Sequence, residues 1–127
     1  MDLREWTIIY VKHRDLMTKK LQGYEEKNGK LVFTFKDHHM HAYAVEKLSV
    51  PTIEGKTLLV TLQTKENVEF LLKHWSEYNK HADLTMVFVH PEKNEKWAVI
   101  PHTHAQVSDP NFEQGIRSMA DSVSYVN

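Results

Sequence analysis

The chain contains no cysteine among its 127 residues. It can therefore form no disulfide, no thiolate nucleophile and no cysteine-type zinc site. This absence suits a reducing compartment, and we expect a cytoplasmic protein. No apolar run approaches the roughly 18 residues of a membrane helix. The opening MDLREW mixes acidic and basic residues, which is not the pattern of a signal peptide. We therefore expect no membrane partner.

Glycine and proline are also scarce, with four of each, and no repeat or linker rich in them interrupts the chain. There is no phosphate-binding P-loop, no G-x-G-x-x-G and no G-x-S-x-G. Hydrophobic residues make up 41% and charged residues 26%, which is an ordinary globular balance. We expect a single domain over residues 1–127. A net charge of −1 argues against strong, nonspecific binding of nucleic acid.

Hydrophobic periodicity predicts the element order α-β-β-β-α-β-β-α. Helical spacings predict a first helix over residues 2–21 that ends near Gly23, although WTIIYV is also typical of a strand. Asn28-Gly29 indicates a turn. Strands are expected over 31–36, 41–48 (ending before Pro51), 57–63 and 84–89, and a fifth in KWAVIPHTHAQV, interrupted at Pro101. The uniformly apolar third strand is typical of the centre of a sheet.

The second helix is predicted to run from Thr64, a suitable N-cap, to about residue 80. Its apolar stripe is predicted to be core and consists of Val68, Leu71, Leu72, Trp75 and Tyr78. Asp109 and Pro110 fit the N-cap and first residue of a last helix over about 110–124. The first three strands would form an antiparallel meander, and the helical crossover would place the fourth strand parallel to the third. This is an α/β (α+β) domain with a mixed five-stranded sheet.

Histidine is abundant, with nine residues, and four of them are candidate metal ligands: His39, His41, His102 and His104. On strands, each H-x-H pair shares one face, so neighbouring strands could bring four imidazoles together around zinc or copper. The alternative is that these are solvated polar positions, and we expect no tight zinc site. Asp37 and Asp109 are candidate carboxylates without a recognisable spacing. A single histidine could act as a general base only beside an orienting carboxylate and a pocket, and the sequence shows neither.

The third predicted strand ends in LLVTLQTK, and NVEFLLKHW and LTMVFVHPEKNEKWAVIP follow it. In this element order the chain resembles the PD-(D/E)xK nuclease fold, which is restriction-endonuclease-like and includes small archaeal Holliday junction resolvases. That family carries a catalytic E-x-K at the end of its third strand. Gln63 and Lys65 occupy the E and K positions, and some restriction-type members have Gln in place of the Glu.

The resemblance implies a divalent metal held by two acidic groups, with the Lys positioning the attacking water. An Asp is expected on the second strand, but HAYAVEKLSV holds only Glu46. Asp37 precedes that strand, and Glu54 follows it. The candidate catalytic residues are therefore Gln63, Lys65 and Glu46, in a degenerate site from which we expect weak or absent cleavage.

A basic group ends the first predicted helix and consists of Lys12, Arg14, Lys19 and Lys20. Cations at a helix C-terminus are favourable in themselves, and phosphate binding is the functional alternative. The sequence as a whole favours a small soluble binding or accessory domain whose partner is nucleic acid or a protein, and it is compatible with a homodimer. The alternatives are a histidine-rich metal-binding protein and an active metal-dependent nuclease.

Overall fold

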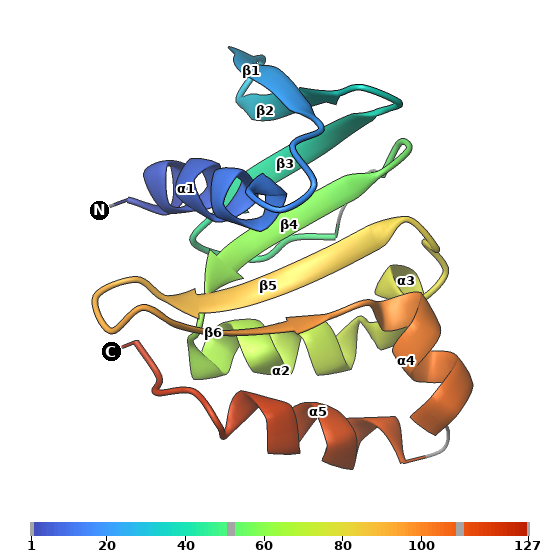
Figure 1. Cartoon of the computed structure of the whole chain (residues 1–127). Helices are drawn as coiled ribbons and strands as arrows, with labels where there is room; N and C mark the ends of the chain where they lie inside the picture. The colour runs from blue at the N-terminus through green and yellow to red at the C-terminus, as the bar shows by residue number, and fades with distance from the viewer. Residues whose placement is uncertain (1, 51–52, 109–110, 127) are drawn as a thin grey trace.

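The computed structural model describes residues 2–50, 53–108 and 111–126, apart from the side chains of 107 and 108. Its strands form one mixed sheet in the order β1-β2-β3-β4-β5-β6 (Figure 1). The strands are β1 (Leu21–Lys27), β2 (Lys30–Phe35), β3 (His39–Val45), β4 (Thr57–Leu62), β5 (Leu84–His90) and β6 (Glu95–Val99). The helices are α1 (Leu3–Asp15), α2 (Lys65–Lys73), α3 (Trp75–Tyr78), α4 (Pro101–Ser108) and α5 (Phe112–Ala120). The sheet thus has six strands rather than the predicted five.

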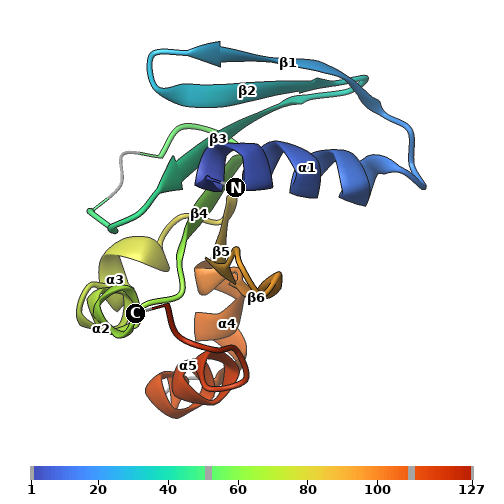
Figure 2. The ribbon, with the colours of Figure 1, turned by 90° about the vertical axis from the view of Figure 1, so that its left-hand side faces the viewer.

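Helices cover the two faces of this sheet unequally (Figures 1 and 2). Helix α1 lies alone on one face, where Trp6 and Val11 pack on Phe33, Val60 and other residues of the central strands. Helices α2 to α5 lie on the other face, where Leu71, Tyr78 and Ile116 pack on the sheet around Phe88 and Trp97. Strand β4 is buried along almost its whole length, as predicted for a central strand.

The first helix is shorter than predicted, because it ends at Asp15 rather than near residue 21. The Asp15 carboxylate accepts hydrogen bonds from the backbone amides of Lys20 (3.0 Å) and Leu21 (2.9 Å), which turns the chain into β1. A register irregularity between Leu21 and Gly23 puts Leu21 and Tyr24, three residues apart, against the same apolar side. Strand β1 was not predicted, because most of its residues are exposed and polar and it lacks the apolar alternation of a buried strand.

The Asn28-Gly29 turn is confirmed and joins β1 to β2. Asn28 and Gly29 have φ angles of 53° and 79°, and Lys27 pairs with Lys30 across the two-residue loop. Asn-Gly suits this turn because both residues tolerate the left-handed region.

The predicted antiparallel meander is wrong at its third strand. Strands β2 and β3 are antiparallel, but β3 and β4 are parallel, with His41 opposite Thr57 and Val45 opposite Thr61. Strand β4 therefore starts at the same end of the sheet as β3, and Leu48, in the connection between the two strands, is buried in the core. The predicted role of Pro51 lies outside the described residues. The parallel pairing of β4 with β5 across α2 is confirmed.

The second predicted helix is confirmed at its start and broken near its end. The Thr64 hydroxyl accepts a hydrogen bond from the amide of Asn67 (3.1 Å), as expected of an N-cap. The helix stops at His74 (φ −107°, ψ 25°), and the short α3 follows. Its predicted stripe is core, with Leu72 half-buried and the other members buried.

After β6 the chain forms a helix rather than the expected continuation of the strand. Pro101 begins α4, a position that suits its fixed φ and missing amide hydrogen. Helix α5 begins at Phe112, and the predicted cap at Asp109 and Pro110 lies outside the described residues. In the part of the chain that is described, no helix is long and apolar enough to cross a bilayer.

Candidate binding site

The four histidines proposed as metal ligands do not form one cluster. His39 and His41 lie on β3, whereas His102 and His104 lie on helix α4 and not on a strand. Two strands, β4 and β5, separate β3 from β6, which leads into α4. Within residues 2–50, 53–108 and 111–126, no group of three or more histidine or carboxylate side chains is placed to hold a metal ion.

Each histidine pair instead has local contacts. The Nδ1 of His39 lies 3.3 Å from the hydroxyl of Thr34, and the Nδ1 of His41 lies 3.3 Å from Nζ of Lys30. On α4, His102 donates from Nδ1 to the carbonyl of Asn79 (2.9 Å). His102 also contacts Gln106, with 3.1 Å between Nε2 atoms, and the His104 ring lies edge-on to Trp75. His102 and His104 therefore join α4 to α3.

Gln63, at the E position of the nuclease-like motif, is a fully buried structural residue. Its Oε1 accepts a 2.7 Å hydrogen bond from the indole of Trp97. Its Nε2 donates to the carbonyls of Ala120 (2.8 Å) and Val123 (3.4 Å). Both ends of the amide are thus engaged inside the protein, and the side chain is not accessible to a metal or a phosphate at the surface.

The parallel pairing of β3 with β4 brings the other two candidate catalytic residues, Glu46 and Lys65, to the same edge of the sheet. Glu46 follows the carboxyl end of β3, and Lys65 follows that of β4. Asn67 joins this edge, because its Nδ2 donates to the carbonyls of Glu46 (2.8 Å) and Leu62 (2.9 Å). The Glu46 side chain is exposed. Lys65 is exposed as well, with its Nζ 5.7 Å from the centre of the Tyr125 ring. The backbones of β3 and β4 pair near this edge, but the buried Gln63 side chain is not grouped with the exposed side chains of Glu46 and Lys65.

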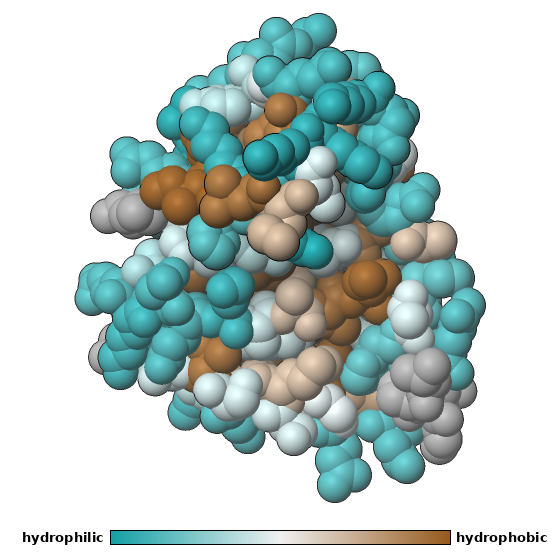
Figure 3. Space-filling model, viewed as in Figure 1, coloured by the Kyte–Doolittle hydropathy of each residue, from teal (hydrophilic) through white to brown (hydrophobic). Residues whose placement is uncertain are grey.

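A cavity of about 450 Å³ lies elsewhere, on the α1 side and at the amino ends of β4 and β5. Figure 3 shows this side of the molecule, where apolar surface lies between hydrophilic surfaces. The cavity floor is apolar and comprises Val11, Phe35, Met40 and Leu58. Its polar lining consists of Arg14, Asp15, Thr18, Lys20, His38, Lys56, Thr57 and Thr85, and Tyr10 and Ile100 complete the wall.

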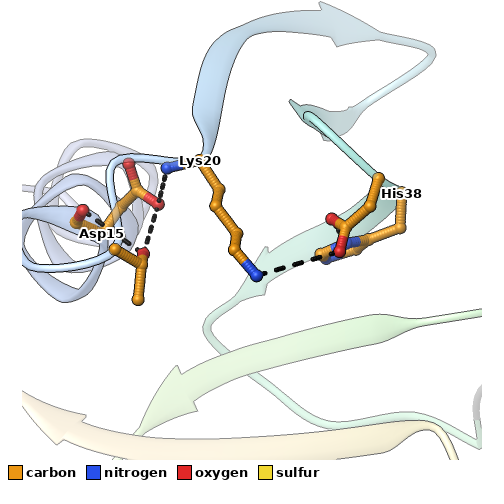
Figure 4. Close-up of polar contacts among 5 residues, drawn as sticks. Asp15, Lys20 and His38 are labelled. Carbon is orange, nitrogen blue, oxygen red and sulfur yellow. Dashed lines mark hydrogen bonds and ion pairs between the residues drawn. The ribbon is translucent and has the colours of Figure 1, made fainter.

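One wall of the cavity is the turn that ends α1. Asp15 accepts hydrogen bonds from the Thr18 hydroxyl (2.9 Å) and from the amides that direct the chain into β1. Burial raises the pKa of Asp15, but these hydrogen bonds outweigh it and the pKa lies below its ordinary value. The carboxylate is therefore charged and turned to its own backbone. Lys20, in contrast, extends across the gap toward Asp37, with Nζ 4.0 Å from Oδ2 (Figure 4).

The opposite wall is the β2–β3 turn, which carries a histidine with an orienting carboxylate. The Nδ1 of His38 lies 2.7 Å from Oδ1 of Asp37, and the His38 ring stacks on Phe35 with centroids 4.6 Å apart and planes 8° apart. The hydrogen bond to His38 is the main reason that the pKa of Asp37 lies below its ordinary value. The sequence showed neither an orienting carboxylate nor a pocket for a histidine, and in the structure His38 has both.

Two further cations complete the rim of the cavity. Arg14 lies over the ring of Tyr10, with Cζ 5.6 Å from the centroid, and its Nη1 donates to the Tyr10 hydroxyl (3.2 Å). Lys56 immediately precedes β4 and is exposed. Arg14, Lys20 and Lys56 together outnumber the two carboxylates, Asp15 and Asp37. With His38 neutral, the site carries a net charge of +1 (three positive and two negative groups).

The sequence indicated part of this site. Arg14 and Lys20 belong to the basic group for which phosphate binding was the functional alternative. Lys56 and Phe35 had no signal of their own, because they come from segments distant from this group, whereas Tyr10 lies on α1 four residues before Arg14. His38 lies in the histidine-rich segment KDHHMHAY (residues 36–43), where the adjacent Asp37 was the available signal.

Comparison with protein-family models, with curated proteins and with solved structures finds no significant match to this chain.

Proposed function

We propose that this protein is a binding or accessory domain rather than an efficient enzyme, and that its cavity binds a ligand with a phosphate or similar anionic group. One observation carries this proposal: Arg14, Lys20 and Lys56 surround a single cavity with an apolar floor. Its volume of about 450 Å³ is within the range of about 300–1,000 Å³ that is usual for ligand sites. Arg and Lys are the side chains that bind phosphate oxygens most readily.

Lys20 is available to such a ligand. Its contact with Asp37 is long, at 4.0 Å, and both side chains are more than half exposed, so water already screens the pair. A phosphate carries more charge than one carboxylate and can attract the same ammonium group. Asp37 keeps its hydrogen bond to His38 when Lys20 moves. Ligand binding therefore does not leave Asp37 without a partner.

Nucleic acid carries many phosphate groups, so the proposed ligands include nucleic acid. The net charge of −1 argues against strong, nonspecific binding of nucleic acid, so we expect binding to depend on this local site. A metal-dependent nuclease remains the alternative that the family resemblance implies. The buried, fully engaged amide of Gln63 supports binding over that chemistry.

The test is calorimetric titration of the protein with inorganic pyrophosphate at low salt. We expect binding that weakens as salt rises, and a loss of at least tenfold in affinity for the double variant Lys20→Ala, Lys56→Ala. Lys80→Ala, an exposed lysine after α3, is the matched control and should bind as the parent does. Equal binding by the double variant, or no binding at low salt, would overturn the proposal.

A further inference from the structure

Aromatic rings lie beside the cations of the cavity, on two different elements. On the β2–β3 turn, the His38 ring is stacked on Phe35. On α1, the Tyr10 ring is stacked on the buried Trp6, with centroids 4.9 Å apart and planes 15° apart. Phe35, His38 and Tyr10 all line the cavity. The site thus has flat apolar surfaces as well as positive charge.

The histidine platform is held from several directions. Phe35 supports one face of the His38 ring, and Oδ1 of Asp37 lies 2.7 Å from its Nδ1. The amide of Phe35 donates to the carbonyl of His38 (2.8 Å), which closes the turn. Little side-chain freedom remains to be lost when a flat ligand stacks on such a surface, so the platform is preorganised.

The charged groups adjoin these rings. Lys20 reaches the Asp37–His38 pair, as Figure 4 shows, and Arg14 lies against Tyr10. A ligand that fits both features has a planar ring joined by a short linker to an anionic group. The cavity volume of about 450 Å³ suits one such unit and is too small to enclose a duplex.

We infer that the ligand is a nucleotide, either free or at the end of a single strand. Its base stacks at the His38–Phe35 platform, and its phosphate is bound by Arg14, Lys20 and Lys56. This inference rests on the proposed function, which supplies the anion site. Stacking of bases on aromatic side chains tolerates all bases, so little preference among the four is expected.

The experiment titrates the unmodified full chain with three probes that differ in one part each: inorganic phosphate, ribose 5-phosphate and adenosine 5′-monophosphate. We expect the nucleotide to bind about tenfold tighter than ribose 5-phosphate, because only the nucleotide has a base to stack. His38→Leu should remove most of this advantage and leave the affinity for ribose 5-phosphate within about twofold. His38→Phe should keep it, and His81→Ala, in the turn after α3, is the control.

The comparison of probes on the parent protein needs no variant, so it holds even if a substitution impairs folding. Equal affinity for the nucleotide and ribose 5-phosphate would overturn the nucleotide inference and leave the anion site standing. No binding of any probe or of pyrophosphate would overturn both. A 5′-phosphorylated single-stranded oligonucleotide that binds tighter than the mononucleotide would identify a strand end as the source, and the reverse order would identify a free nucleotide.

Discussion

The indole nitrogen of Trp97 donates a 2.7 Å hydrogen bond to the side-chain oxygen of Gln63. This bond joins β6 to the end of β4, beneath a C-terminal segment that also binds Gln63 through the carbonyl of Ala120. The backbone takes part as well, because the amide of Val126 donates to the carbonyl of Gln63 (2.7 Å). Gln63 is therefore the point at which three parts of the chain meet.

Replacing Gln63 by Glu should destabilise the protein. The new carboxylate would be buried against the carbonyls of Ala120 and Val123, with no amide group to donate to them. We expect the free energy of unfolding in urea to fall by at least about 2 kcal/mol. Gln114→Glu, on the exposed side of α5, should change it little. A variant that gained Mg²⁺-dependent cleavage without losing stability would instead favour the nuclease interpretation.

Asn67 should be equally sensitive. Its Oδ1 accepts from the amide of Leu48 (3.0 Å), and its Nδ2 donates to the carbonyls of Glu46 and Leu62. Asn67→Ala would leave these buried backbone groups without their partner, so we expect the free energy of unfolding to fall by about 2–4 kcal/mol. Asn111→Ala is the exposed control. Comparable midpoints for the two variants would show that water replaces the asparagine at no cost.

The C-terminal segment should loosen in acid because of Glu95. The backbone amide of Ser124 donates to this carboxylate (2.9 Å) and is the main cause of a pKa below the ordinary Glu value. A depressed pKa in the folded state means that the stabilisation is present above the ordinary Glu pKa and is lost as pH falls through the folded pKa. We expect exchange of the Ser124 amide hydrogen, compared with its intrinsic rate, to become less protected in that range.

Glu95→Gln should remove this pH dependence and leave the protection of Ser124 constant across the same range. Glu92→Gln, in the neighbouring turn, should keep the parent behaviour. A titration of the Glu95 side chain by NMR with a midpoint at or above the ordinary Glu value would contradict the prediction.

Cleavage of nucleic acid should be weak or absent. A Mg²⁺ site usually needs one or two carboxylates together with the substrate phosphate, and no such carboxylate takes the place of Gln63. Duplex, branched and single-stranded DNA incubated with Mg²⁺ or Mn²⁺ should therefore remain intact with the parent and with Lys65→Ala alike. Robust cleavage that Lys65→Ala abolishes would establish an enzyme and reject the binding proposal.

Purified without a histidine tag, the protein should carry no stoichiometric, chelator-resistant metal. The reason is the separation of His39 and His41 on β3 from His102 and His104 on α4. Elemental analysis of the parent decides the matter. A bound metal that disappears in the double variant His39→Ala, His41→Ala would overturn this expectation, and His13→Ala is the control.

The sequence by itself determined the elements whose signals are local. Thr64 and the stripe from Val68 to Tyr78 specify α2 and the short α3 after it, because a cap and an apolar face act within a few turns, but the break at His74 was not predicted. Asn28-Gly29 specifies the β1–β2 turn through its backbone preferences alone. The uniformly apolar β4 was recognisable as a central strand, since only burial on both faces permits that composition.

Tertiary structure alone decided the direction of β3 relative to β4, the existence of β1 and the helical start at Pro101. The direction of β4 depends on packing outside the strand, such as the burial of Leu48 after β3, and β1 is an edge strand defined by its partner β2 and by hydrogen bonds to Asp15. The candidate site shows the same division. The basic group near Arg14 and Lys20 was visible in the sequence, but folding brought Lys56 and the Phe35–His38 stack beside it, because contacts between distant segments leave no local pattern.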